Sequence, residues 1–323
     1  MENLDFLQFN TSCRKTIHSY SEDILTYSLL SCVTLLTVVL NLLVIISISH
    51  FRKLYTTTNL LLLSLAVSDF LVGLLLMPFE LFMRSCWIIG NFMCAVTYFV
   101  GFLFVNASVG TMVLISVDRY IAICDPMFYS TKVTLKRVQL CVCLCWIFSS
   151  VHGSLMMKDF LKQPDRYDPC YGQCCIVINE NEGTVDLIVT FIGPITVIIV
   201  LYMRVFVVAV SQARAMRFHS AAVTFQRPET VTAKKSELKA ARTLGVVIAV
   251  FLMCFCPFYC VSLSGRKILV SSSNEDFTVF VMYFNSCLNP LIYAFFYPWF
   301  RKSIKFIVTL EILQPDLREA NIL

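Results

Sequence analysis

Polar side chains inside otherwise apolar stretches of this sequence offer oxygens that could hold a hard cation. Asp69, Asn41 and Asn289 each stand within a long apolar stretch. If the stretches cross at one depth, these three groups can satisfy one another's hydrogen bonds. Further oxygen donors at a similar depth are Ser108, Asn285 and Ser286. Because oxygen ligands suit hard cations, the group predicts a cation site, a structural hydrogen-bond cluster, or both.

Asn289-Pro290 is an unusual pair for an apolar helix. Proline removes a backbone donor and kinks a helix, and the asparagine amide needs a partner in hydrocarbon. A polar kink of this kind indicates either a moving part or a bend kept for packing.

A second group of residues that could have a chemical role is Asp118-Arg119-Tyr120, at the end of another apolar stretch. An arginine at such a boundary needs an acid or water. Asp118 is adjacent in sequence, and Glu237 opens a later stretch on the same predicted face. We expect either an Arg119–Glu237 pair that can open, or two solvated boundary charges.

The elements that must position these groups are helices that cross a membrane. The chain has 323 residues, of which 58% are hydrophobic and 15% charged, which is too apolar for an ordinary soluble domain. A spanning helix needs about 20 apolar residues. The sequence therefore predicts an all-α membrane protein with a seven-transmembrane helix bundle. The predicted helices are residues 24–48, 59–83, 92–123, 138–157, 185–210, 244–262 and 277–297.

Lysine and arginine set the expected orientation. With the N-terminus outside, 18 of the 26 basic residues lie in inner segments. We expect residues 1–23 to be an extracellular tail without a cleaved signal peptide, and residues 24–297 to be the seven-helix domain. Residues 298–323 should form a short amphipathic eighth helix, over residues 297–310, and an inner tail. That helix should hold the membrane through Phe300, Ile304, Phe306 and Ile307.

Several common functions find no support in the sequence. It contains no Gly-rich phosphate loop, no Ser/His/Asp arrangement and no metal-ligand spacing, so we expect no enzyme. The four histidines each stand alone near a predicted membrane boundary. The net charge of +5 follows from the topology and implies no nucleic-acid partner. Outer cysteines should form bridges, and Asn10-Thr11-Ser12 is a glycosylation acceptor on the outer tail.

Marker residues occur in order along the whole chain, at least one in each predicted helix. They are Asn41, Leu65-Ala66-Val67-Ser68-Asp69, Cys94, Asp118-Arg119-Tyr120, Trp146, Pro194, Tyr202, Phe255-Cys256-Pro257-Phe258 and Asn289-Pro290-Leu291-Ile292-Tyr293. This set resembles the rhodopsin-like class of G-protein-coupled receptors. Asn285-Ser286, Tyr297, Trp299-Phe300, residues 234–244 and residues 170–174 are similar to the trace-amine-associated receptors within that class.

The resemblance implies a multi-pass plasma-membrane receptor that acts on a stimulatory or olfactory heterotrimeric G protein, with olfactory cilia as an expected location. It implies an activation switch formed by Asp118, Arg119, Glu237, Tyr202, Phe255, Pro257, Asn289, Pro290 and Tyr293. It also implies a modulatory sodium ion at Asp69, Ser108, Asn285, Ser286 and Asn289. The implied disulfides are Cys94–Cys174, with Cys175 as the alternative, and Cys13–Cys170.

The chain departs from its relatives at the position that binds a ligand ammonium in aminergic receptors. That position is Gly101 here, and residues 92–117 contain no acid. Asp186 offers a replacement, two helical turns before Pro194 and on the same helix face as Thr190. The alternative is that Asp186 pairs with Arg166, Lys158 or Lys162.

The sequence offers further candidate pocket residues. Glu80 is a second outer acid that could take another ammonium or pair with Arg84. The aromatic pocket positions are Phe102, Phe258, Tyr259 and Tyr283, whose alternative role is plain core packing. Phe255 replaces the usual tryptophan of the switch.

We therefore expect a receptor for volatile or biogenic amines that signals to cAMP, with the ammonium on Asp186 and lipid around the helices. The alternatives are an aminergic neurotransmitter-type receptor, which Gly101 argues against, and a receptor for a non-amine odorant. A transporter or channel should show an inverted repeat or a polar file along several helices, and the sequence shows neither.

Overall fold

The computed structural model describes residues 20–79, 91–158, 162, 180–222, 245–261, 273–314 and 319, and these contain helices and no strand. Six predicted functional residues lie outside the described part of the chain: Asn10, Cys13, Glu80, Cys170, Cys174 and Glu237. The backbone of Cys94 is helical, but its side chain is also outside the description.

Seven helical segments coincide with the seven predicted spans. The long helices are α1 (Tyr20–His50), α2 (Thr57–Leu71), α4 (Asn91–Cys124), α6 (Leu135–Met156), α8 (Glu180–Asp186) continuing into α9 (Gly193–Ala222), and α11 (Ser273–Phe296). Six spans within the described residues are long and apolar enough to cross a membrane, and Gly245–Val261 is a shorter apolar helix. The predicted all-α, seven-helix fold is thus confirmed.

Short elements join or extend these helices. They are η2 (Arg52–Leu54), η3 (Val72–Leu76), α5 (Pro126–Lys132), η5 (Leu187–Ile192), α12 (Pro298–Val308) and η6 (Glu311–Leu313). Two of them, η3 and η5, are π-helical turns within longer helices. Such widened turns are frequent at functional sites. The turn η5 follows Asp186 directly, which places that residue where the helix changes its winding.

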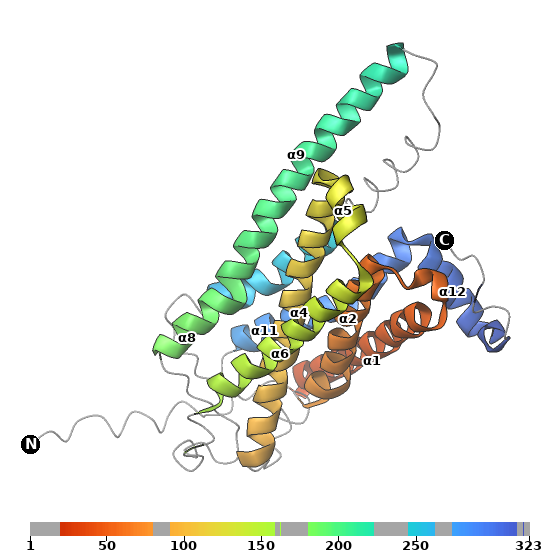
Figure 1. The fold of residues 1–323 in the computed structure, drawn as a ribbon. Coiled ribbons are helices and arrows are strands. Elements are labelled where there is room, and N and C mark those ends of the chain that lie inside the picture. Colours follow the sequence, from red (N-terminus) through yellow and green to blue (C-terminus); the bar gives the residue numbers. More distant parts are fainter. Residues whose placement is uncertain are drawn as a thin grey trace, which may run out of the picture.

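Helix α4 is the centre of the bundle. It packs against α2, α6 and α9, while α1 packs against α2 and α11 (Figure 1). The indole of Trp146 on α6 donates a hydrogen bond to Ser64 Oγ on α2, at 3.1 Å, and so fastens these neighbours together. Helix α9 projects well beyond the rest of the bundle (Figure 1).

The amphipathic helix α12 is attached to the protein more firmly than its sequence suggested. Trp299 and Phe300 are 5% and 0% exposed and belong to the core that also contains Tyr293. The prediction that Phe300 holds the membrane is therefore wrong, because its ring is buried within the bundle. Ile304 and Phe306 pack against the same core.

Candidate functional site

The outer candidate site is built around Asp186, the last residue of α8. One turn on, Thr190 Oγ donates to the backbone oxygen of Asp186, at 2.7 Å. The same hydroxyl lies 3.1 Å from the hydroxyl of Tyr259. Because the single Thr190 proton is already donated, Tyr259 must be the donor in the second bond. This chain of bonds links the fifth and sixth spans at the level of Asp186.

The carboxylate of Asp186 faces a histidine that the sequence did not single out. Its Oδ1 lies 3.6 Å from Nε2 of His152 on α6, and the two side chains are 19% and 8% exposed. Neither atom has a hydrogen-bond partner among the described residues. Of the alternative partners, Lys158 instead forms an ion pair with Glu182 at 2.7 Å.

Aromatic side chains border this acid on one side. The ring of Tyr259 stacks on Phe191, with centroids 4.1 Å apart, and meets Phe258 edge-on at 5.2 Å. Phe102 contacts the ring of His152 edge-on at 6.4 Å. The structure thus brings Thr190 and Tyr259 close to Asp186, while Phe258 reaches this group through Tyr259 and Phe102 reaches it through the histidine.

Two predicted pocket residues lie in different surroundings. A Cβ atom at Gly101 would make one ordinary van der Waals contact, with the Cδ2 atom of Leu76 in η3 at 3.8 Å, so a methyl group would fit at this position. Tyr283 on α11 packs against the hydrophobic core. No described contact connects either residue to Asp186.

The central cluster surrounds Asp69, which is 0% exposed. Ser286 Oγ donates to its Oδ1 and Asn289 Nδ2 donates to its Oδ2, each at 2.8 Å. Asn41 does not bond to the carboxylate as expected, because its amide donates to the backbone oxygens of Ser286 and Thr37. Helices α1, α2 and α11 are thereby joined at one depth.

Four buried oxygens in and beside this cluster make no hydrogen bond within the described residues. They are Asn41 Oδ1, Ser108 Oγ, Asn285 Oδ1 and Asn289 Oδ1. Buried oxygens are rarely left without a partner. A small hard cation next to the Asp69 carboxylate would supply one. The donor set therefore fits a sodium ion, although within the described residues no group of three histidine, cysteine or acidic side chains forms a metal site.

The inner cluster is a buried ion pair. Asp118 and Arg119 are 5% and 4% exposed, so Arg119 is not a solvated charge, while Glu237 lies outside the described residues. Arg119 Nε donates to Asp118 Oδ2 at 3.0 Å. The same carboxylate accepts from Thr58 Oγ, at 3.0 Å, and from the hydroxyl of Tyr129 on α5, at 3.1 Å. The pair therefore ties α4 to α2 and α5.

The remaining switch residues are distributed along the fifth, sixth and seventh spans. The hydroxyls of Tyr202 and Tyr293 are buried and make no hydrogen bond within the described residues. Phe255 is 3% exposed and packs on Phe251, with ring centroids 4.4 Å apart. Pro290 lies inside α11, and Pro257 lies inside the helix Gly245–Val261.

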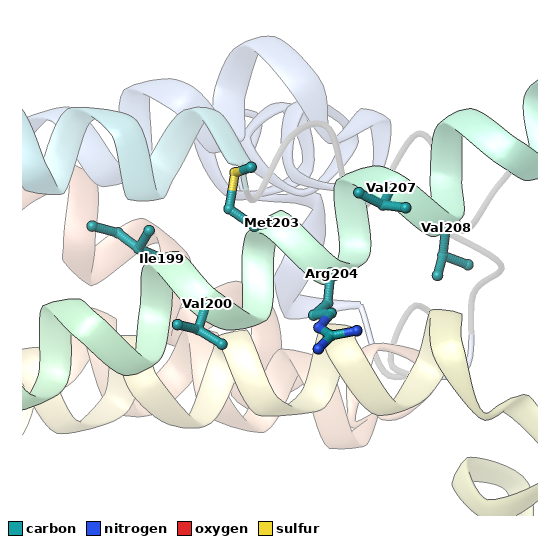
Figure 2. A pocket seen from close by; sticks show the side chains of 6 residues that line it. All are labelled: Ile199, Val200, Met203, Arg204, Val207 and Val208. Carbon is teal, nitrogen blue, oxygen red and sulfur yellow. The ribbon is translucent and has the colours of Figure 1, made fainter.

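A hollow of about 400 Å³ is separate from all three clusters. It is lined by Ile199, Val200, Met203, Arg204, Val207 and Val208 of α9 (Figure 2). Four of the apolar members, Ile199, Val200, Met203 and Val207, are 45% to 61% exposed, as expected for side chains that face lipid. Arg204 points to the opposite side of α9 from Met203 (Figure 2).

Comparison with known proteins first defines the class. Residues 40–293 match the family described as 7 transmembrane receptor (rhodopsin family). The chain is 35% identical to trace amine-associated receptor 13c of Danio rerio, over 98% of this chain and 95% of the relative. It is 35% identical to trace amine-associated receptor 5 of Rattus norvegicus, over 98% and 94%, and 34% identical to trace amine-associated receptor 1 of Mus musculus, over 95% of each.

The chain therefore belongs to the rhodopsin family of seven-transmembrane receptors and, within it, to the trace amine-associated receptors. These are G-protein-coupled receptors and not enzymes, as the sequence indicated. Membership in this family, together with the apolar spans, makes the chain a multi-pass protein of the plasma membrane.

Proposed function

We propose that this receptor detects organic amines, and that the ligand ammonium pairs with Asp186. The observation that carries the proposal is Asp186 Oδ1, a buried carboxylate oxygen within a membrane-spanning segment that makes no hydrogen bond among the described residues. An intramembrane acid is expensive unless it is paired, and such residues usually mark a functional site. An ammonium ion would provide both the opposite charge and the missing hydrogen bond.

The surroundings of Asp186 support the same ligand class. The faces of Phe258 and Tyr259 can add a cation–π attraction of about 1–2 kcal/mol in a desolvated site. The apolar part of the ligand would lie toward Gly101, where the absence of a side chain keeps bulk out of the bundle. The curated relatives are named for trace amines, which agrees with an ammonium in this pocket.

A reporter assay for cAMP tests this proposal. Cells that express the wild-type receptor would be challenged with primary, secondary and tertiary amines, diamines and their neutral alcohol analogues. A rise in cAMP with amines alone supports an amine receptor coupled to a stimulatory or olfactory G protein. Responses to the neutral analogues at equal potency would instead favour a receptor for non-amine odorants and make Asp186 structural.

Activation would change the partners of Arg119. In the proposed resting state Arg119 pairs with Glu237, and in the active state the sixth span pivots at Pro257 and Arg119 meets Tyr202, which opens the inner cleft for the G protein. To change the ratio of active to resting receptor from 1:99 to 99:1, the ligand must bind the active state more tightly than the resting state by about 5.5 kcal/mol.

The Glu237→Ala variant tests this lock. We expect higher basal cAMP, because the resting state loses one partner of Arg119 while the active state loses nothing. Basal cAMP would be compared with wild type at matched surface expression, with Glu311→Ala, at the start of η6, as a control. Equal basal cAMP in Glu237→Ala and wild type would show that the lock does not exist.

A sodium ion beside Asp69 would favour the resting state. Asp69, Ser108, Asn285, Ser286 and Asn289 would hold it, and the ion would neutralise the buried carboxylate. We expect replacement of sodium by N-methylglucamine to strengthen agonist binding in wild type by roughly fivefold or more. Asp69→Asn keeps the size of the side chain and should abolish this dependence. A sodium effect that survives in Asp69→Asn places the ion elsewhere.

The remaining parts of the proposal concern topology. The N-terminal tail with a glycan on Asn10 would lie outside the cell, where Cys94–Cys174 and Cys13–Cys170 would form, and the inner basic segments would face the G protein. Olfactory cilia are the proposed site of expression.

A further inference from the structure

Three polar side chains from different spans meet in the outer half of the bundle. His152 Nδ1 on α6 lies 3.0 Å from the amide nitrogen of Asn106 on α4, and His152 Nε2 lies 3.6 Å from Asp186 Oδ1. Asn106 and His152 are each 7% exposed. The imidazole is thus buried between an amide and a carboxylate.

The orientation of the imidazole is fixed by its neighbours. Phe148 stacks on the ring, with centroids 6.2 Å apart and an interplanar angle of 27°, and Phe102 meets the ring edge-on. Asn106 holds Nδ1 from the other side. Because the ring is held on three sides, Nε2 points toward Asp186.

The gap between the two facing atoms is too wide for a hydrogen bond. Both atoms are buried and make no hydrogen bond within the described residues. Leaving two buried polar atoms unmatched is costly, so the pair needs a partner that satisfies both. The Asn106 amide can offer its oxygen or its nitrogen to Nδ1. When the oxygen accepts from Nδ1–H, the lone pair of Nε2 is free to accept a hydrogen bond.

We propose that His152 is the second acceptor of the ammonium and that it makes this receptor selective for primary over tertiary amines. The inference rests on the proposed pairing of the ammonium with Asp186. A primary ammonium has three N–H donors and can bond to Asp186 and His152 together. A tertiary ammonium has one N–H, which Asp186 takes, so Nε2 stays buried without a partner and an alkyl group lies against it.

The size of the preference for primary amines follows from the hydrogen bond to His152 Nε2 that a tertiary ammonium cannot make. A hydrogen bond to a charged group is the stronger kind, and a site built for an N–H rejects ligands that lack it. We expect wild type to favour a primary amine over its N,N-dimethyl derivative by roughly 10- to 100-fold.

The test compares the potency ratio of 2-phenylethylamine and its N,N-dimethyl derivative, and of cyclohexylamine and its N,N-dimethyl derivative, across variants of His152. His152→Gln places a polar group near the Nε2 position and should keep most of the ratio. His152→Asn keeps a polar group near Nδ1 but loses Nε2, so the ratio should fall to within about threefold of unity. His50→Asn is the matched control, because Nε2 of His50 is also buried without a partner but lies on α1.

The ratio separates binding from folding, because a purely structural role of His152 would change both potencies together. An unchanged ratio in His152→Asn, in a receptor that still responds to amines, overturns this inference alone. A wild type that responds to none of the four amines overturns the proposed function and this inference with it.

Discussion

Replacement of Asp186 by alanine is expected to remove the response to every amine. Truncating one partner of a buried charge pair costs about 2–5 kcal/mol, which raises the half-maximal concentration by roughly 30-fold to more than 1,000-fold. Asp186→Glu keeps the charge but moves it by one methylene, so it should restore part of the response. Potency and maximal cAMP would be measured at matched surface expression.

Glu182→Ala is the matched control for this experiment. Glu182 is an acid one turn earlier on α8, and its carboxylate already forms an ion pair with Lys158. Removing it should change amine potency by less than about fivefold, since a partly exposed pair contributes little. An amine response that survives in Asp186→Ala would move the ammonium to another acid, with Glu80 as the first candidate.

Asp118→Ala should have the largest effect on receptor stability. The carboxylate accepts hydrogen bonds from Arg119, Thr58 and Tyr129, and the ion pair is buried. Breaking a buried pair from one side leaves an uncompensated charge, at a cost of about 3–5 kcal/mol. We expect a clearly lower melting temperature of the purified receptor and higher basal cAMP, because Arg119 loses the partner that holds it in place.

Asp125→Ala provides the comparison for this variant. Asp125 is an exposed acid seven residues later that caps α5 by accepting from the amide of Phe128 at 3.0 Å. Loss of such a cap costs about 1 kcal/mol. Equal melting temperatures for Asp118→Ala and Asp125→Ala would show that the buried pair contributes no more than an exposed cap.

The fold could be predicted from the sequence because each membrane-spanning helix is a run of about 20 mostly apolar residues, which composition alone shows. All seven spans and the eighth helix are present, since every backbone group in lipid must be satisfied within a helix. The cluster at Asp69 was also predictable, because a charge in an apolar stretch is conspicuous. The hydrogen-bond partners within the cluster could not be predicted. Asn41 donates to the backbone oxygen of Ser286 on α11 and not to the Asp69 carboxylate.

The part of the site that escaped prediction depends on helix packing. In the sequence, His152 is one of four histidines that each stand alone near a predicted membrane boundary, and nothing connects it to Asn106. Each of these residues is a polar side chain on an apolar helix, which could have marked it as a candidate site residue. Only the packing of α4 against α6 shows that Asn106 and His152 meet. The burial of Phe300 likewise follows from tertiary contacts.

The central claim is that Asp186 recognises the positive charge of the ligand. The most direct measurement is the binding of a primary amine and of its isosteric neutral alcohol to purified wild type and to Asp186→Asn, which preserves the size of the side chain. If Asp186 holds the ammonium, the amine should bind roughly 100-fold more tightly than the alcohol in wild type and within about threefold of it in Asp186→Asn. An amine preference of the same size in both proteins would contradict the claim.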